Sequence, residues 1–185
     1  FDPYEAIANG LSAGMDIVGR YFENGLYFLP NLVISAEAMN AGIDILRPHI
    51  KVERDQVQGT MVLGTVRGDI HDIGKNLVKI MMTAHGFEVH DLGHNVPYEH
   101  YLEKVAEVKA DIIGLSALMA TSMLGMEKMV TLVKDNFPEG SVLTMVGGAP
   151  LSEAFAQRIG AEAYAEDAVK AVAVAKKLMQ AKVAG

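Results

Sequence analysis

The strongest constraint on the fold is a regular alternation of short apolar runs with helical segments, which begins near residue 59. Five runs are rich in aliphatic and β-branched residues and predict strands: 59–66, 87–93, 111–118, 141–150 and the shorter 161–167. The segments that follow them predict helices at about 75–85, 98–110, 122–137, 151–158 and 167–182. Such alternation predicts an α/β domain with a parallel sheet covered by helices on both faces.

The carboxyl ends of the predicted strands are the expected place for a ligand. In open parallel sheets, ligands bind beyond these ends, where the strand order reverses. Three segments come directly after predicted strands: the loop 67–74, the residues after Leu115, and the pair Gly147–Gly148. We therefore expect these three segments to converge on one site.

The N-terminal fifty residues have a different pattern. Apolar residues recur at spacings of three and four in 7–22 and again in 33–46, which predicts two helices. Gly25 is expected to end the first helix, and Pro30 to lie in the first turn of the second. Two helices alone make a poor core, so an upstream helix is expected to be missing. The predicted division is a helical segment at 1–51, a polar linker at 52–58 and the α/β domain at 59–185.

Composition excludes several classes of function. The chain has no cysteine, which excludes disulfides, thiolate nucleophiles and cysteine-ligated metals and fits a cytoplasmic location. The formal net charge is −7 and no basic stripe is visible, which argues against nucleic acid as a partner. No apolar run approaches the roughly 18 residues of a spanning helix, and no signal peptide is visible, so no membrane association is expected.

The segment GDIHDIGKN, residues 68–76, concentrates the chemistry of the chain. It resembles a phosphate loop only superficially, because five residues separate its two glycines instead of four and Asn76 replaces the Mg²⁺-binding hydroxyl. A conventional metal site would instead join Asp69, His71 and Asp72 to a second histidine, His90 or His94. A purely structural alternative is a polar loop in which Asp72 stabilises a helix N-terminus.

A fourth interpretation uses every residue of the motif. A neutral imidazole is a good axial ligand for a transition metal, and its second nitrogen usually donates to a carboxylate. Asp69, two residues before His71, can be that carboxylate. Gly74 has no side chain and would let a bulky group pass between the loop and the sheet.

The spacing of these residues matches a known family. Asp69, His71 and Gly74 fit the D-x-H-x-x-G signature of cobalamin-binding domains, and SALMATS (116–122) and GGAP (147–150) follow at that family's distances. The stretch FENGLYFLPNLVISAEAMNAG (22–42) resembles the cap of the methionine synthase cobalamin module. Essentially the whole chain is similar to free-standing corrinoid proteins of methanol, methylamine and methoxyaryl methyltransferase systems. The resemblance implies a Rossmann-like (flavodoxin-like) cobalamin-binding domain preceded by a helical-bundle cap.

The resemblance also implies how the cofactor is held. Cobalamin would bind base-off/His-on, with His71 replacing the dimethylbenzimidazole arm as the lower cobalt ligand. Asp69 would hold the His71 ring, and Ser122 would extend this relay. The residues expected to bind the cofactor are Asp69, His71, Asp72, Ile73, Gly74, Ser116, Leu118, Thr121, Gly147 and Gly148, with Phe28 and Leu29 of the cap over its upper face. The sequence departs from the methionine synthase module at Ala120, where that module has a threonine; Thr121 beside it is expected to compensate.

Simpler roles remain open for several of these residues. Ser116 and Ser122 can cap helices, the glycine pair can be an ordinary loop, and Phe28 and Leu29 can be helix-packing core.

The function implied is that of a methyl carrier which is not catalytic alone. A substrate-specific methyltransferase would load the cobalt, and a second methyltransferase would pass the methyl group to coenzyme M or tetrahydrofolate. The cofactor would alternate between methylcobalamin and cob(I)alamin, and a reductive activator is a further possible partner. Two alternatives are a cobalamin-dependent sensor and the B12-binding subunit of an adenosylcobalamin mutase. The chain has no tryptophan, which such sensors bury near the upper ligand, and the mutase subunits usually lack the helical cap.

Overall fold

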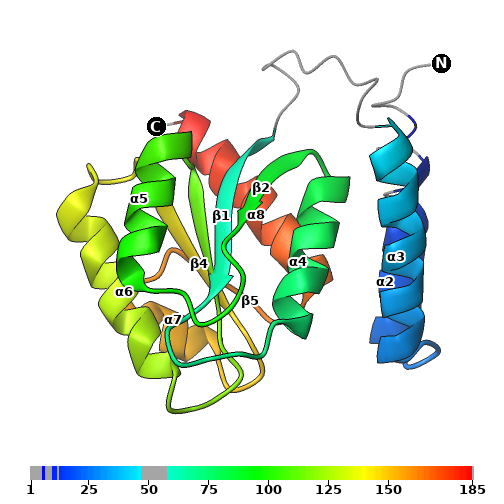
Figure 1. Cartoon of the computed structure of the whole chain (residues 1–185), viewed down its shortest axis with the longest axis horizontal. Helices are drawn as coiled ribbons and strands as arrows, with labels where there is room; N and C mark the ends of the chain where they lie inside the picture. The colour runs from blue at the N-terminus through cyan, green and yellow to red at the C-terminus, as the bar shows by residue number, and fades with distance from the viewer. Residues whose placement is uncertain (1–5, 7–9, 12, 47–57, 185) are drawn as a thin grey trace.

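The C-terminal part of the chain forms a five-stranded parallel sheet (Figure 1). The computed structural model describes residues 6, 10–11, 13–46 and 58–184. The strands are β1 (Gly59–Thr65), β2 (Phe87–Asp91), β3 (Ile112–Ser116), β4 (Leu143–Gly147) and β5 (Ala163–Ala165). They pair in the order β2-β1-β3-β4-β5, so the order reverses between β1 and β3. The predicted parallel sheet, including its short fifth strand, is confirmed.

Helices cover both faces of the sheet, as the alternating pattern predicts. The helices are α4 (Ile73–Ala84), α5 (Tyr98–Val108), α6 (Met123–Asn136), α7 (Glu153–Ile159) and α8 (Ala168–Ala184). Figure 1 shows α4 and α8 on one face and α5, α6 and α7 on the other. Along β1, Met61 and Leu63 pack toward the first face and Val62 toward the second, because successive side chains of a strand alternate.

Two further helices form the N-terminal segment. They are α2 (Ala13–Glu23) and α3 (Leu29–Leu46), joined by a short turn in which Gly25 has a positive φ of 70°. The expected stop at Gly25 and start near Pro30 therefore agree with the structure. The polar stretch 52–58 lies outside the described residues except for its last residue, Gln58.

Among the described residues, the helix pair α2/α3 has no hydrophobic core of its own. Its buried residues Met15, Leu32, Ala36, Met39 and Ile43 belong to the same cluster as the α4/α8 face of the sheet. Figure 1 shows the pair standing beside α4. The apolar face of α3 therefore packs against the α/β domain.

No helix within the described ranges is long and apolar enough to cross a membrane.

Candidate functional site

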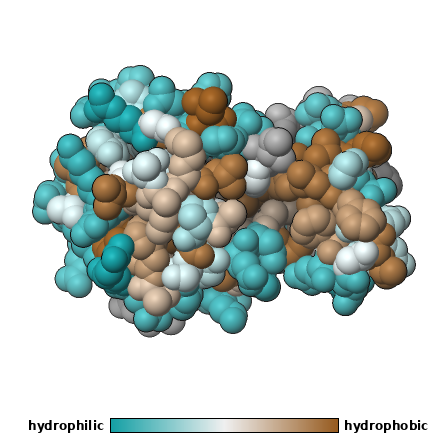
Figure 2. Space-filling model, turned by 90° about the horizontal axis from the view of Figure 1, so that it is seen from below, coloured by the Kyte–Doolittle hydropathy of each residue, from teal (hydrophilic) through white to brown (hydrophobic). Residues whose placement is uncertain are grey.

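The carboxyl ends of β1, β3, β4 and β5 open on one cavity of about 610 Å³. It lies between α4 and α8, and the helix pair contributes Phe22, Leu29 and Leu32 to its wall. Figure 2 looks at this edge of the molecule and shows hydrophobic side chains gathered on the helix pair. The three loop segments that the sequence predicts to converge all contribute lining residues, which confirms that expectation.

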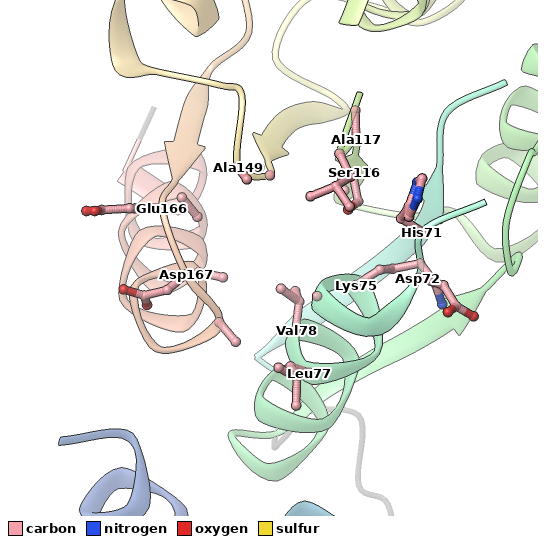
Figure 3. A pocket seen from close by; sticks show the side chains of 18 of the residues that line it. His71, Asp72, Lys75, Leu77, Val78, Ser116, Ala117, Ala149, Glu166 and Asp167 are labelled. Atoms are coloured by element: carbon pink, nitrogen blue, oxygen red, sulfur yellow. The ribbon is translucent and has the colours of Figure 1, made fainter. Parts of the chain in front are cut away.

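The walls of the cavity are mostly apolar. The aliphatic lining residues come from the sheet and from both flanking helices: Leu63, Leu77, Val78, Leu115, Met145, Val146 and Val169. Figure 3 shows Val78 on α4 and Ser116 at the end of β3 facing the same space, with His71 at its edge. Glu166 and Asp167 also line the cavity, but in Figure 3 their carboxylates point away from it. The site therefore suits a large organic ligand with a nonpolar part.

The carboxylate of Asp69 is held in place by hydrogen bonds from several parts of the site. Its side chain is fully buried, at 0% exposure, and its carboxylate accepts hydrogen bonds from three segments. One oxygen, Oδ1, accepts from the backbone and the ring of His71, at 3.0 and 2.9 Å. The other, Oδ2, accepts from the amides of Leu118 and Met119, at 2.8 and 3.1 Å, and from the hydroxyl of Ser122 at 2.6 Å. A buried carboxylate with this many donors is held in one orientation.

These donors keep Asp69 ionised. Burial by itself raises the pKa of the Asp69 carboxyl, because a charge is poorly solvated inside the protein. The hydrogen bonds from Ser122, from the amides of His71 and Leu118, and from the His71 ring outweigh burial and hold this pKa well below its usual range. Asp69 is therefore an anion facing the imidazole.

The geometry of His71 follows from this contact. Its Nδ1 lies 2.9 Å from the Asp69 carboxylate, which accepts a proton from the ring. The Nε2 atom has no hydrogen-bond partner among the described residues, and the side chain is 44% exposed and lines the cavity. With Nδ1 protonated, the neutral ring carries its lone pair on Nε2. His71 can thus offer one nitrogen to a metal carried by a ligand in the cavity.

Two glycines shape the site for different reasons. A Cβ built on Gly74 meets no atom within 4 Å, although Gly74 lines the cavity. Among the described residues no atom occupies this position, so the space beside Gly74 is open. At Gly148, a Cβ would lie 1.8 Å from the carbonyl oxygen of Ala117, and φ is 134°. Gly148 therefore lets the loops after β3 and β4 approach each other.

The structure does not support the two simpler interpretations of the motif, a conventional metal site and helix capping. No group of three or more His, Asp and Glu side chains in the described part of the chain could hold a metal ion, which goes against a conventional metal site. Asp72 directly precedes α4, but its side chain makes no capping hydrogen bond. The side chain of Ser122 does not cap α6 either; its hydroxyl donates to Asp69.

The remaining predicted residues are only partly brought together. Those that line the cavity with His71 and Gly74 are Asp72, Ser116, Leu118, Gly147, Gly148 and Leu29. Neither Thr121 nor Phe28 is part of the lining: Thr121 is exposed, and Phe28 is 69% exposed. The side chain of Ile73 lies outside what the structure describes.

Several lining residues have no counterpart in the sequence prediction. Leu77 and Val78 follow Gly74 by three and four residues, so helical spacing places them on the same face of α4. That signal was available in the sequence. Val169 and Ala171 of α8 carried no comparable signal, because their place depends on how the last helix returns to the sheet.

The comparisons with known proteins match this chain to B12-binding and corrinoid proteins. Two family models, each described as a B12 binding domain, match residues 59–173 and residues 1–47. Dimethylamine corrinoid protein 2 of Methanosarcina acetivorans is 47% identical over 182 residues, which are 98% of this chain and 84% of that protein. Trimethylamine corrinoid protein 1 of Methanosarcina mazei is 45% identical over 177 residues, 95% of this chain and 82% of that protein.

Solved structures agree with the sequence comparison. A cobalamin-binding protein from Desulfitobacterium hafniense superposes with a TM-score of 0.77 at 35% identity, covering 90% of this chain and 79% of that one. The methanol:cobalamin methyltransferase complex from Methanosarcina barkeri contains a chain that superposes with a TM-score of 0.80 at 32% identity. That match covers 97% of this chain and 68% of the other.

Proposed function

The chain belongs to the family of B12-binding domains, and on this premise we propose that it carries a methyl group on the cobalt of a bound corrinoid. A substrate-specific methyltransferase loads the carrier, and a second methyltransferase removes the methyl group to coenzyme M or tetrahydrofolate. The two relatives named above, at 45–47% identity, are a dimethylamine corrinoid protein and a trimethylamine corrinoid protein. We therefore favour a methylamine as the methyl donor and a methylamine methyltransferase as the loading partner. A reductive activator completes the set of proposed partners.

The observation that carries this proposal is the arrangement of His71. Asp69 holds Nδ1 of the ring, so Nε2 would be available to coordinate the cobalt of a bound corrinoid. In this proposal the cofactor would bind base-off/His-on, and the cavity between α4 and α8 would receive its nucleotide arm. Gly74 leaves room for the arm, and Ser116, Leu118, Gly147 and Gly148 contribute to its surroundings.

In this proposal His71 and Asp69 can also accept and stabilise a proton. When bound, the corrinoid supplies the methyl-transfer chemistry, because its cobalt can accept a methyl group and give it up. An imidazole whose Nε2 is not bound to a metal could take up a proton there, and the anionic Asp69 would stabilise the resulting imidazolium. Ser122 holds the carboxylate in place during both states through its hydrogen bond to Oδ2.

The helix pair α2/α3 is the proposed cap over the upper face of the cofactor. Leu29 is placed to take part, since it lines the cavity, while Phe28 would have to turn inward from its exposed position. In this view residues 1–51 are the cap, 52–58 the linker and 59–185 the cobalamin-binding domain. The separate family matches to 1–47 and 59–173 support this division.

An absorption spectrum of the reconstituted protein tests the proposal. The purified chain is mixed separately with methylcobalamin and adenosylcobalamin, and the His71→Ala variant is measured in parallel. We expect tight binding of methylcobalamin and a spectral change that requires His71. In the variant, the affinity for methylcobalamin should fall by at least about 10- to 100-fold, the loss that is typical when only a hydrogen-bond partner of a metal ligand is removed.

His94→Ala is the matched control, because His94 is an exposed histidine in a neighbouring loop. It should behave as wild type. Preferential binding of adenosylcobalamin would replace the carrier by a sensor or mutase subunit. Failure to bind either cofactor would refute the proposed function.

A further inference from the structure

The loop that carries His71 is held from behind by a residue outside the motif. Asn95, in the connection between β2 and α5, accepts a hydrogen bond on its side-chain oxygen from the amide of Gly68, at 2.8 Å. Its own amide lies 2.9 Å from both the carbonyl oxygen of Asp69 and the hydroxyl oxygen of Thr65. To make these contacts Asn95 adopts a left-handed backbone, with φ of 51°. Asparagine tolerates this conformation better than most residues.

Thr65 also holds the backbone of Asp69 by a hydrogen bond. It is the last residue of β1, fully buried, and its hydroxyl donates to the carbonyl of Asp69. Its amide donates to the carbonyl of Gly93, at 3.1 Å. The backbone of Gly68 and Asp69 is therefore fixed by Thr65 and Asn95, while the Asp69 carboxylate is fixed separately by the loop after β3.

An ion pair between a buried lysine and a partly buried aspartate ties this arrangement to α4. Lys75 is only 1% exposed, and its ammonium lies 2.6 Å from Oδ1 of Asp91 at the end of β2. The same oxygen accepts the amide of Gly93, at 2.9 Å. Contacts thus run from Lys75 through Asp91 and Gly93 to Thr65 and back to Asp69. The loop 67–72 is held at its start by this network and at its end by the helix that carries Lys75.

Stability alone is a weak explanation for this network. A buried ion pair is often no more stabilising than apolar residues of the same size, because both charges lose their hydration. Here the pair joins the two elements that flank the loop of His71. A loop that is ordered before its ligand arrives loses less conformational entropy on binding.

We propose that Asn95 and the Lys75–Asp91 pair are positioning residues for the cobalt ligand. They hold loop 67–72 so that Nε2 of His71 faces the cavity before the corrinoid binds. This inference rests on the proposed function, since a positioning role presupposes that His71 coordinates cobalt.

The first test uses Asn95→Gly, which keeps the left-handed backbone accessible and removes only the side-chain acceptor. In the protein without cofactor, amide hydrogen exchange of Gly68 and Asp69 should become about tenfold faster, because their local opening becomes easier. With methylcobalamin at neutral pH, the histidine-ligated fraction in the absorption spectrum should fall and the dissociation constant should rise about tenfold. Asn95→Asp retains an acceptor oxygen and should lie close to wild type.

Lys109→Gly is the matched control, because Lys109 is the other non-glycine residue with a positive φ in the described chain. It lies at the end of α5, away from the motif loop, and its replacement should change neither readout. The double variant Lys75→Met/Asp91→Asn removes both charges together, so neither is left unpaired. It should shift the histidine-ligated fraction in the same direction as Asn95→Gly.

The outcomes separate the inference from the function on which it rests. If Asn95→Gly and the double variant both retain the wild-type exchange rates and histidine-ligated fraction, the positioning role is refuted while the proposed function stands. If wild-type protein shows no histidine-dependent spectrum, the proposed function fails, and the positioning role fails with it.

Discussion

Asp91 shows how one partly buried carboxylate can link separate elements. It accepts hydrogen bonds from Lys75 on α4 and from the amide of Gly93, and it also lies 3.3 Å from the exposed ammonium of Lys79. Burial raises the pKa of Asp91, but the hydrogen bonds from Lys75 and the Gly93 amide, together with the positive charges of Lys75 and Lys79, outweigh burial and hold this pKa below its ordinary value. The ionised form is therefore the one that the fold stabilises.

Asp91→Asn should accordingly destabilise the protein in a pH-dependent way. At pH 7 the variant leaves Lys75 buried without its counterion, and we expect a loss of about 3 kcal/mol. The carboxylate has a lowered pKa in the folded state, so its contribution is fully present above the unfolded pKa of about 3.9 and is lost as the pH falls through the folded pKa. Urea unfolding at pH 7 and at a series of lower pH values measures the difference. A gap between the two proteins that stays constant down to pH 2 would contradict this account.

Single residues also show what could be predicted from the sequence. Asp69 and His71 stand two positions apart, so their contact is local and their residue types suffice to predict it. Ser122 is 53 residues from Asp69, and only the resemblance to a family linked the two. Asn95 gave no signal, because an asparagine in a loop is ordinary and its partners depend on how β1 and β2 are aligned.

At the level of elements, the strand–loop junctions allow a contrast between two glycines. Gly74→Ala places a methyl group in open space at the start of α4, and Gly148→Ala places one 1.8 Å from the Ala117 carbonyl. The first variant should retain the unfolding temperature of the wild type, or gain slightly from alanine's helix propensity, but bind methylcobalamin more weakly. The second should lose about 3 kcal/mol or more of stability.

Thermal unfolding without cofactor, followed by titration with methylcobalamin, distinguishes the two effects. Equal loss of stability in both variants would mean that Gly74 serves the fold and leaves no room for a ligand.

The elements themselves were largely predictable, and their docking was not. Periodicity identified the strands and helices because each has a repeating apolar face. Periodicity did not predict that α3 packs beside α4, because an apolar face on a helix does not indicate which element it packs against. The buried residue of the first turn of α3 is Leu32, whereas Val33, which the pattern favoured, is only partly buried.

At the scale of the whole molecule, the helix pair meets the α/β domain at a close contact. A Cβ built on Gly19 of α2 would lie 2.6 Å from a methyl carbon of Val169 at the start of α8. Gly19→Leu should therefore push α2 away from α8 and loosen the pair. We expect a larger radius of gyration by small-angle X-ray scattering and faster release of bound methylcobalamin.

Gly14→Leu on the same helix provides the control, because a Cβ there meets nothing within 4 Å. It should keep the dimensions and the release rate of the wild type. If both leucine variants behave alike, the contact between Gly19 and Val169 does not hold the two parts together.

The shared core has a consequence for anyone who wishes to excise a part of this protein. The boundary near residue 58 is clear in sequence, yet Met81 and Met82 of α4 belong to the same buried cluster as Met39 and Ile43 of α3. A fragment trimmed at that boundary would turn part of an interior into a surface. Making the α/β half a stand-alone module therefore requires redesigning the outer face of α4 with polar side chains, and the same applies to transplanting α2/α3 onto another host.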